Sequence, residues 1–193
     1  MKRIATVLSV FALLISICSC AEKHAPKEIL FQEGADDWTI DGDAKWKFVN
    51  DELIGTLDSG AGFVMTKKSY SDFVLELEFK PDSSINSGVF IRCKERILSH
   101  TDCYEINIWD LHPNQENRTG ALVSRAKPLN KVETLDVWNT YKIKNQKDKL
   151  QAWINGVLVI DLKNSDLIDG PIALQAAESG EIRFRDVRLT NLD

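Results

Sequence analysis

A carboxylate, an amide and an indole occupy alternate positions of one short segment, as Glu105, Asn107 and Trp109. Alternate side chains of a β-strand point to the same face of a sheet, so these three would share one surface. The apolar residues between them would pack on the opposite side. If the preceding segment also buries its apolar residues, Arg92 points to the same surface as Glu105. The spacing therefore predicts a polar sheet face that carries an aromatic ring.

Such a face suits a carbohydrate, because an indole can stack on the apolar side of a sugar ring while planar polar groups hydrogen-bond its hydroxyls. An equally good interpretation is a cross-strand ion pair between Arg92 and Glu105 on a wet surface, contributing less than about 1 kcal/mol. His112 lies in the longest polar stretch, residues 110–120. It could be a base or a metal ligand, or simply a solvated loop residue. The residues alone leave these alternatives open.

The charge balance and the missing motifs argue against several classes of function. The chain has 24 basic and 29 acidic residues, a formal net charge of −5. It therefore lacks the basic surface typical of proteins that bind nucleic acid or anionic lipid headgroups. It also lacks a phosphate-binding loop, a nucleophile elbow, a zinc-protease motif and a dinucleotide-binding glycine pattern. We expect no nucleic-acid partner.

The elements that must position these residues are strands. Apolar and polar residues alternate with period two in five segments, and no segment has a sustained helical stripe; the segments are 73–79, 89–92, 104–109, 141–144 and 182–189. Residues 150–154 and 157–160 flank Asn155-Gly156, the dipeptide that best fits a type I′ hairpin turn. A short helical turn is expected in a loop such as 164–168. The pattern predicts an all-β fold, an antiparallel two-sheet sandwich or a barrel.

The N-terminus has the features of an export signal. Lys2 and Arg3 precede an uncharged apolar run, residues 4–17, which is too short and wrongly flanked for a membrane span. Ser19 and Cys20 end this segment in a way that resembles a bacterial lipobox, with Cys20 as the acylated residue. An ordinary secretory signal cut near Ala21 is the alternative.

This interpretation divides the chain into three parts. We expect residues 1–20 to be a lipoprotein signal peptide, 21–28 to be a tether and 29–193 to be a single domain. The protein would then be lipid-anchored to a membrane of the cell envelope, in the periplasm or at the cell surface. In an oxidising compartment the two remaining cysteines, Cys93 and Cys103, could form a disulfide or remain as two buried free thiols.

Several segments, taken in order, resemble the 3-keto-disaccharide hydrolase family, formerly a domain of unknown function. The similarity extends over roughly residues 29–192, and no single segment carries it. The matching segments are Phe73–Phe79, Asn86–Arg92, Tyr104–Asp110, Thr119–Leu122, Trp138-Asn139, Ile154–Gly156, Gly170–Gln175 and Phe184–Arg188.

The resemblance implies a concanavalin A/laminin-G-like jelly roll with a sugar-binding concave face. It also implies cleavage of 3-keto-glycosides or disaccharides, in which the C3 ketone acidifies the C2 proton, a base removes it, the aglycone leaves and water adds back. On this basis Glu105 is the expected base or a ligand of a divalent metal, and Arg92 the electrophilic donor. Asp110 or His112 would assist. A separate sugar C3-dehydrogenase would supply the oxidised substrate.

In the same hypothesis Asn107 and Trp109 position the sugar. The sequence departs from the family after Gln175, where many members have a histidine and this chain has Ala176-Ala177-Glu178. This departure favours a second function, a non-catalytic carbohydrate-binding module that uses the same face. A third is a jelly roll that binds another protein.

Overall fold

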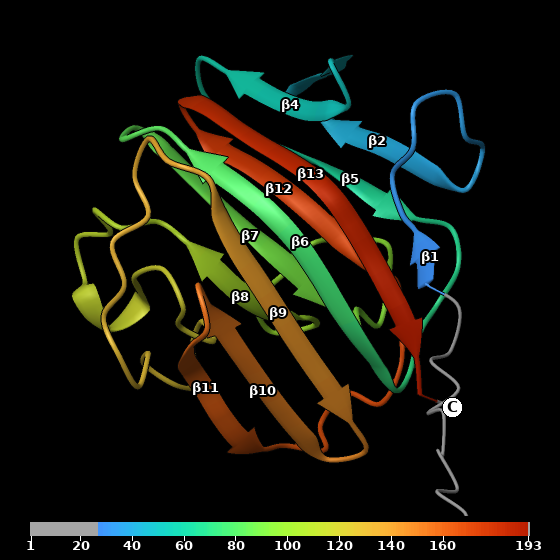
Figure 1. Ribbon diagram of the computed structural model, residues 1–193, viewed down its shortest axis with the longest axis vertical. Helices are drawn as coiled ribbons and strands as arrows, with labels where there is room; N and C mark the ends of the chain where they lie inside the picture. The colour runs from blue at the N-terminus through green and yellow to red at the C-terminus, as the bar shows by residue number, and fades with distance from the viewer. Residues whose placement is uncertain (1–26, 193) are drawn as a thin grey trace, which may run out of the picture.

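A computed structural model describes residues 27–192, and it forms two packed antiparallel β-sheets (Figure 1). The predicted signal peptide and Cys20 lie outside the described residues. Sheet A has eight strands, seven in the order β11-β10-β9-β6-β13-β4-β3 and β1 paired with the other end of β13. Sheet B has five strands, in the order β2-β5-β12-β7-β8. The all-β jelly-roll prediction is confirmed.

The strands of sheet A are β1 (Lys27–Ile29), β3 (Lys45–Val49), β4 (Glu52–Leu57), β6 (Phe73–Pro81), β9 (Asn139–Gln146), β10 (Lys149–Ile154), β11 (Val157–Lys163) and β13 (Gly180–Asn191). Those of sheet B are β2 (Trp38–Gly42), β5 (Ala61–Thr66), β7 (Ile85–Ile91), β8 (Tyr104–Ile108) and β12 (Ala173–Glu178). A 3₁₀ turn, η1 (Gln115–Asn117), interrupts the loop after β8. Within residues 27–192, no helix is long and apolar enough to cross a membrane.

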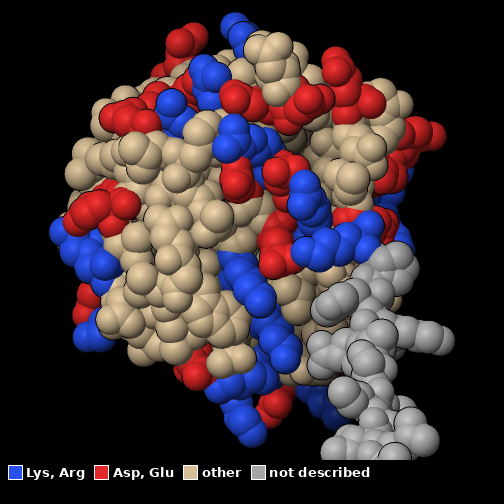
Figure 2. All heavy atoms as spheres, viewed as in Figure 1, with Lys and Arg blue, Asp and Glu red and all other residues tan. Residues whose placement is uncertain are grey.

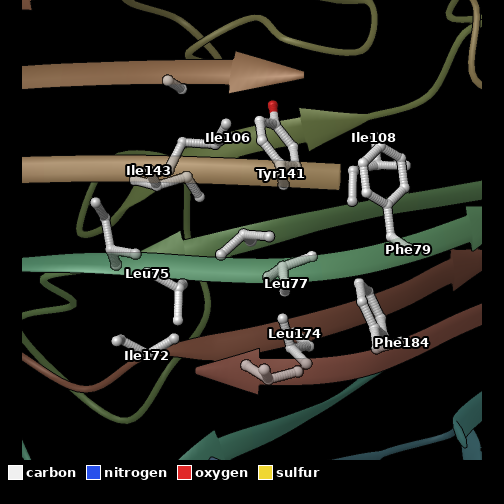
Figure 3. Close-up of a cluster of buried hydrophobic side chains, with 14 of the residues drawn as sticks. Leu75, Leu77, Phe79, Ile106, Ile108, Tyr141, Ile143, Ile172, Leu174 and Phe184 are labelled. Atoms are coloured by element: carbon white, nitrogen blue, oxygen red, sulfur yellow. The ribbon is translucent and has the colours of Figure 1, made fainter. Parts of the chain in front are cut away.

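The core lies between the sheets and follows from the period-two alternation. On β6 every second side chain, from Phe73 to Pro81, is buried, while those between are half-exposed. Leu75, Leu77 and Phe79 of sheet A point toward Ile106 and Leu174 of sheet B (Figure 3). Each large apolar side chain buried in this way contributes about 1.5–3 kcal/mol. The outer face of sheet A is instead charged, with acidic and basic side chains interleaved (Figure 2).

The predicted hairpin is present. Asn155 and Gly156 have φ angles of 50° and 79°, as a type I′ turn requires, and they join β10 to β11. The prediction of a helical turn at 164–168 is wrong; among the described residues the 3₁₀ turn is η1. β1 also begins at Lys27, inside the predicted tether, because it pairs with the end of β13 at Thr190.

Candidate functional site

β7 and β8 lie side by side near the edge of sheet B, and their outward side chains form the candidate site, which we call the β7–β8 face. The alternation on β8 is as predicted: Tyr104, Ile106 and Ile108 are buried in the core, whereas Glu105 and Asn107 alternate with them and so point outward. Residues 120–123 continue the sheet beyond β8, since Val123 donates its amide to the Glu105 carbonyl at 3.0 Å.

Glu105 has an unusual environment for a carboxyl group. It pairs with Phe90 on β7, whose ring belongs to a small buried cluster with Met65 and Ala173. Burial raises the pKa of Glu105 to about 7. Within residues 27–192, no side chain or backbone amide donates a hydrogen bond to its carboxylate. A partly buried, unpaired carboxyl with this pKa can accept a proton near neutral pH.

Three amide oxygens on the same face are buried and have no hydrogen-bond partner among residues 27–192: those of Asn86, Asn107 and Gln175. The strand register explains why they gather. Gly88 on β7 pairs with Asn107 on one side and with Gln175 on the other, and directly paired residues share a face. Asn86, two residues from Gly88, points the same way. Buried polar groups are rarely left unpaired, so this is a part of the described fold where polar atoms exceed the partners that packing supplies.

Gly88 forms the floor between these amides. A Cβ atom at this position would lie 3.3 Å from the Phe90 ring and 3.6 Å from the Glu105 Cγ. The missing side chain therefore leaves open the space that Glu105, Asn107 and Gln175 surround. Asn107 is held in place because its Nδ2 donates to the Asn117 carbonyl.

Trp109 and His112 lie beyond the end of β8, at the rim of the face. Their rings make an edge contact with centroids 4.4 Å apart. His112 Nδ1 accepts a hydrogen bond from the Asn114 amide at 2.9 Å, so in the neutral ring the proton is on Nε2. The backbone of Trp109 is held in place by a hydrogen bond from its amide to Thr119 Oγ1 at 2.8 Å.

Asp110 does not join this group. Its carboxylate is buried and accepts hydrogen bonds from the Thr134 amide at 2.6 Å and from Thr134 Oγ1 at 2.9 Å. It also faces the buried Arg118 guanidinium at 3.7 Å. Asp110 continues the parity of the core residues of β8, which accounts for its inward direction. It anchors the loop that follows β8 to the loop before β9.

The prediction that Arg92 shares the surface of Glu105 is wrong. The residue is 1% exposed, and its guanidinium donates to the carbonyls of Ser71, Lys147 and Leu167 and to the Asp72 carboxylate. The backbone gives the reason: Arg92 has a φ of 51°, a left-handed conformation that ends the strand alternation directly after β7.

Cys93 and Cys103 form a disulfide. It joins the chain just after β7 to the chain just before β8, and it is buried against the same cluster as Phe90. The sequence left this pairing open. The bond ties together the two strands that carry the site.

The face offers oxygen atoms of the type that Ca²⁺ and Mg²⁺ prefer: one carboxylate and three amide oxygens. Glu105, Asn107, Asn86 and Gln175 are therefore the residues that could hold a divalent cation. Among the described residues, no three His, Cys, Asp or Glu side chains form a metal-binding group.

Sequence reasoning missed Asn86 and Gln175. Both could have been assigned to the outward face by strand alternation, because each is next to a buried residue of its strand, Ser87 on β7 and Leu174 on β12. The residues that face one another across the floor come from three strands, β7, β8 and β12, which are distant in sequence. Their neighbourhood could not be predicted without the sheet order.

Comparison with known proteins gives a family and a fold. Residues 28–190 match the 3-keto-alpha-glucoside-1,2-lyase-like domain family. No curated protein sequence is significantly similar to the chain. A candidate glycosyl hydrolase from Parabacteroides distasonis superposes with a TM-score of 0.75 at 22% identity, covering 86% of this chain and 100% of that one.

Two further structures share the fold at lower identity. The carbohydrate-binding module CBM66 from Bacillus subtilis has a TM-score of 0.63 and 17% identity, covering 80% of this chain and 96% of that one. The β-glucanase of Bacillus licheniformis has a TM-score of 0.59 and 16% identity, covering 88% and 99%. At these identities the likeness concerns the fold alone.

Proposed function

Because the chain belongs to the 3-keto-alpha-glucoside-1,2-lyase-like domain family, we propose that it acts on carbohydrate at the β7–β8 face and cleaves 3-keto-glycosides. The observation that carries the proposal is the combination on one face, among the described residues, of an unpaired carboxyl with a pKa near 7 and three unpaired amide oxygens. The amides supply partners for sugar hydroxyls, and Glu105 is the one carboxyl group beside them that has no partner.

The reaction balances without a redox cofactor. The Glu105 carboxylate takes the proton from C2, which the neighbouring C3 ketone makes acidic. The resulting enolate expels the aglycone oxygen from C1, forming a C1–C2 double bond, and the aglycone oxygen takes up the proton that Glu105 carries, so Glu105 is ionised again. Water then adds across that bond, with oxygen to C1 and hydrogen to C2, so the net change is hydrolysis.

The enolate oxygen needs a donor, and Arg92 is not available for this role because its guanidinium is engaged elsewhere. The Gln175 amide nitrogen and His112 Nε2 are the candidate donors on and beside the face. Trp109 would stack on the sugar at the rim. A cation held by the oxygen ligands would polarise the ketone when bound.

The test replaces Glu105 with glutamine, which keeps the shape and removes the base. With a 3-keto-glucoside as substrate, we expect aglycone release, followed by NMR, to fall at least 100-fold in Glu105→Gln. Glu95→Gln is the matched control, since Glu95 is exposed in the loop between the two cysteines. Release at the wild-type rate from Glu105→Gln would refute the assignment.

The same assay separates a second candidate function, a non-catalytic carbohydrate-binding module. The observation that favours it is the segment after Gln175, where Ala176 is buried in the core and Ala177-Glu178 follow in place of the family's histidine. A protein that broadens the sugar signals but releases no aglycone above background would be such a module.

We also propose that the protein is exported and lipid-anchored to a membrane of the cell envelope through Cys20. In this setting a separate sugar C3-dehydrogenase supplies the 3-keto substrate. The sequence of residues 1–20 supports the first part, and the chemistry requires the second, since elimination across C1–C2 needs the ketone already in place.

A further inference from the structure

The outer face of sheet A carries a groove on the side of the sandwich opposite the β7–β8 face. Its volume is about 510 Å³, within the size range of small-ligand sites. β6, β9, β10 and β13 supply its walls. Six side chains that line it are Glu76, Glu78, Thr140, Lys142, Trp153 and Arg188.

Tryptophan side chains lie on this face at two places. Trp153 is half-buried beside the groove, with Lys142 Nζ 5.8 Å from the ring centroid. Trp138, just before β9, is also half-buried and stacks against the Arg185 guanidinium, whose carbon is 3.9 Å from the ring centroid. Because Trp153 pairs with Lys142, strand geometry separates the Cα atoms of Trp138 and Trp153 by roughly 14 Å. More than one sugar ring is needed to bridge that span.

The charges on this face alternate in sign. Arg188, Glu76 and Lys142 lie side by side across three strands. Lys27 binds Glu76 at 2.5 Å, Arg188 binds Asp186 at 2.7 Å, and Arg185 pairs with Glu78. Figure 2 shows this interleaving of acidic and basic groups along the middle of the face.

This charge pattern indicates the class of ligand. A polyanion would meet the carboxylates of Glu76, Glu78 and Asp186, and a polycation would meet the lysines and arginines. A neutral oligosaccharide suits both, because each hydroxyl can donate to a carboxylate and accept from an ammonium or guanidinium group. The indole of Trp153 offers the apolar surface on which a pyranose ring stacks.

We propose that the sheet A groove is a second glycan-binding site, which holds a neutral glucan chain on the face opposite the β7–β8 face. It performs no chemistry. It holds a longer chain on the protein independently of whether the β7–β8 face is catalytic, so this proposal does not rest on the proposed reaction.

The test measures binding of cellotetraose, laminaritetraose and maltotetraose to the purified protein by calorimetry. We expect at least one of them to bind, Trp153→Ala to weaken that binding at least tenfold, and Trp153→Phe to retain most of it because the aromatic platform remains. Glu105→Gln should bind the same tetrasaccharide as tightly as the wild type.

The outcomes separate this proposal from the proposed function. If none of the three tetrasaccharides binds, or if Trp153→Ala binds as well as the wild type, the second site is overturned. If binding is lost in Glu105→Gln but not in Trp153→Ala, the glycan lies on the β7–β8 face instead. Aglycone release from a 3-keto-glucoside should be unchanged in Trp153→Ala, and its absence in every variant would count against the reaction alone.

Discussion

At the scale of single residues, the behaviour of Glu105 depends on how far it is removed from water. Its carboxyl lies beside the Phe90 ring, with no donor among the described residues to stabilise the charged form. Its pKa is therefore about 7 in the folded protein, against an ordinary value of 4.5. Burying this carboxylate lowers the stability of the folded protein, but the raised pKa suits a group that accepts a proton near neutral pH.

This cost predicts a pH-dependent stability difference. Between pH 4.5 and 7 the unfolded chain loses the Glu105 proton before the folded protein does, so the free energy of unfolding falls as pH rises. Glutamine cannot ionise. We therefore expect Glu105→Gln to be more stable than the wild type by about 1–3 kcal/mol at pH 8, and by much less at pH 4.5.

Urea denaturation of both proteins at the two pH values measures this difference, with Glu95→Gln as the control that should follow the wild type. A stability gap that stays constant from pH 4.5 to 8 would show that Glu105 does not titrate as described. In the wild type, the rate of aglycone release should rise with pH through about 7, because the base acts in its ionised form.

At the scale of elements, the buried Arg92 side chain holds several segments of the chain together. Its guanidinium connects the end of β7 to the segment before β6, to the turn between β9 and β10 and to the loop before β12. Removing a buried charged side chain that has several hydrogen-bond partners lowers stability strongly, because its partners stay buried without a donor.

We therefore expect Arg92→Met to lower the free energy of unfolding by about 3–5 kcal/mol. Arg96→Met is the control; Arg96 is exposed and should cost less than about 1 kcal/mol. Denaturant titration gives both values. If Arg92→Met kept its stability but lost turnover, Arg92 would have the catalytic role that its buried position argues against.

Arg92 also shows where sequence reasoning succeeds and fails. Period-two alternation predicted β6 and β8, because one buried face imposes it residue by residue, and Asn155-Gly156 predicted the β10–β11 hairpin. The alternation failed at Arg92, where one positive φ reverses the direction of the side chain. It did not indicate β2 to β5, of which β2 is only half-buried or exposed. Glu105, Asn107 and Trp109 were found because one short segment carries them; Gln175 needed the register of β12 against β7.

At the scale of the whole molecule, the described domain begins where β1 pairs with the end of β13. The proposed acyl anchor would be attached a few residues before that strand. We expect Cys20→Ser to move the protein from the membrane fraction to the soluble fraction of the producing bacterium, because a diacylated cysteine supplies the membrane affinity.

Cell fractionation and immunoblotting measure the change, with Cys18→Ser as the matched control that should remain in the membrane fraction. A soluble wild-type protein would instead support the ordinary secretory signal cut near Ala21. Neither result bears on the two proposed glycan-binding faces, since both are built from residues 27–192.

Gly88 determines how deeply a ligand can sit on the β7–β8 face. The polar groups that surround it belong to β8 and β12, and a Cβ atom at this position would raise the floor and press on the Phe90 ring at 3.3 Å. Among members of the family, the residue at this position could determine which substrates fit on the face without changing the residues that carry out the reaction. The absence of a methyl group at this one position would then set how deeply a substrate can bind.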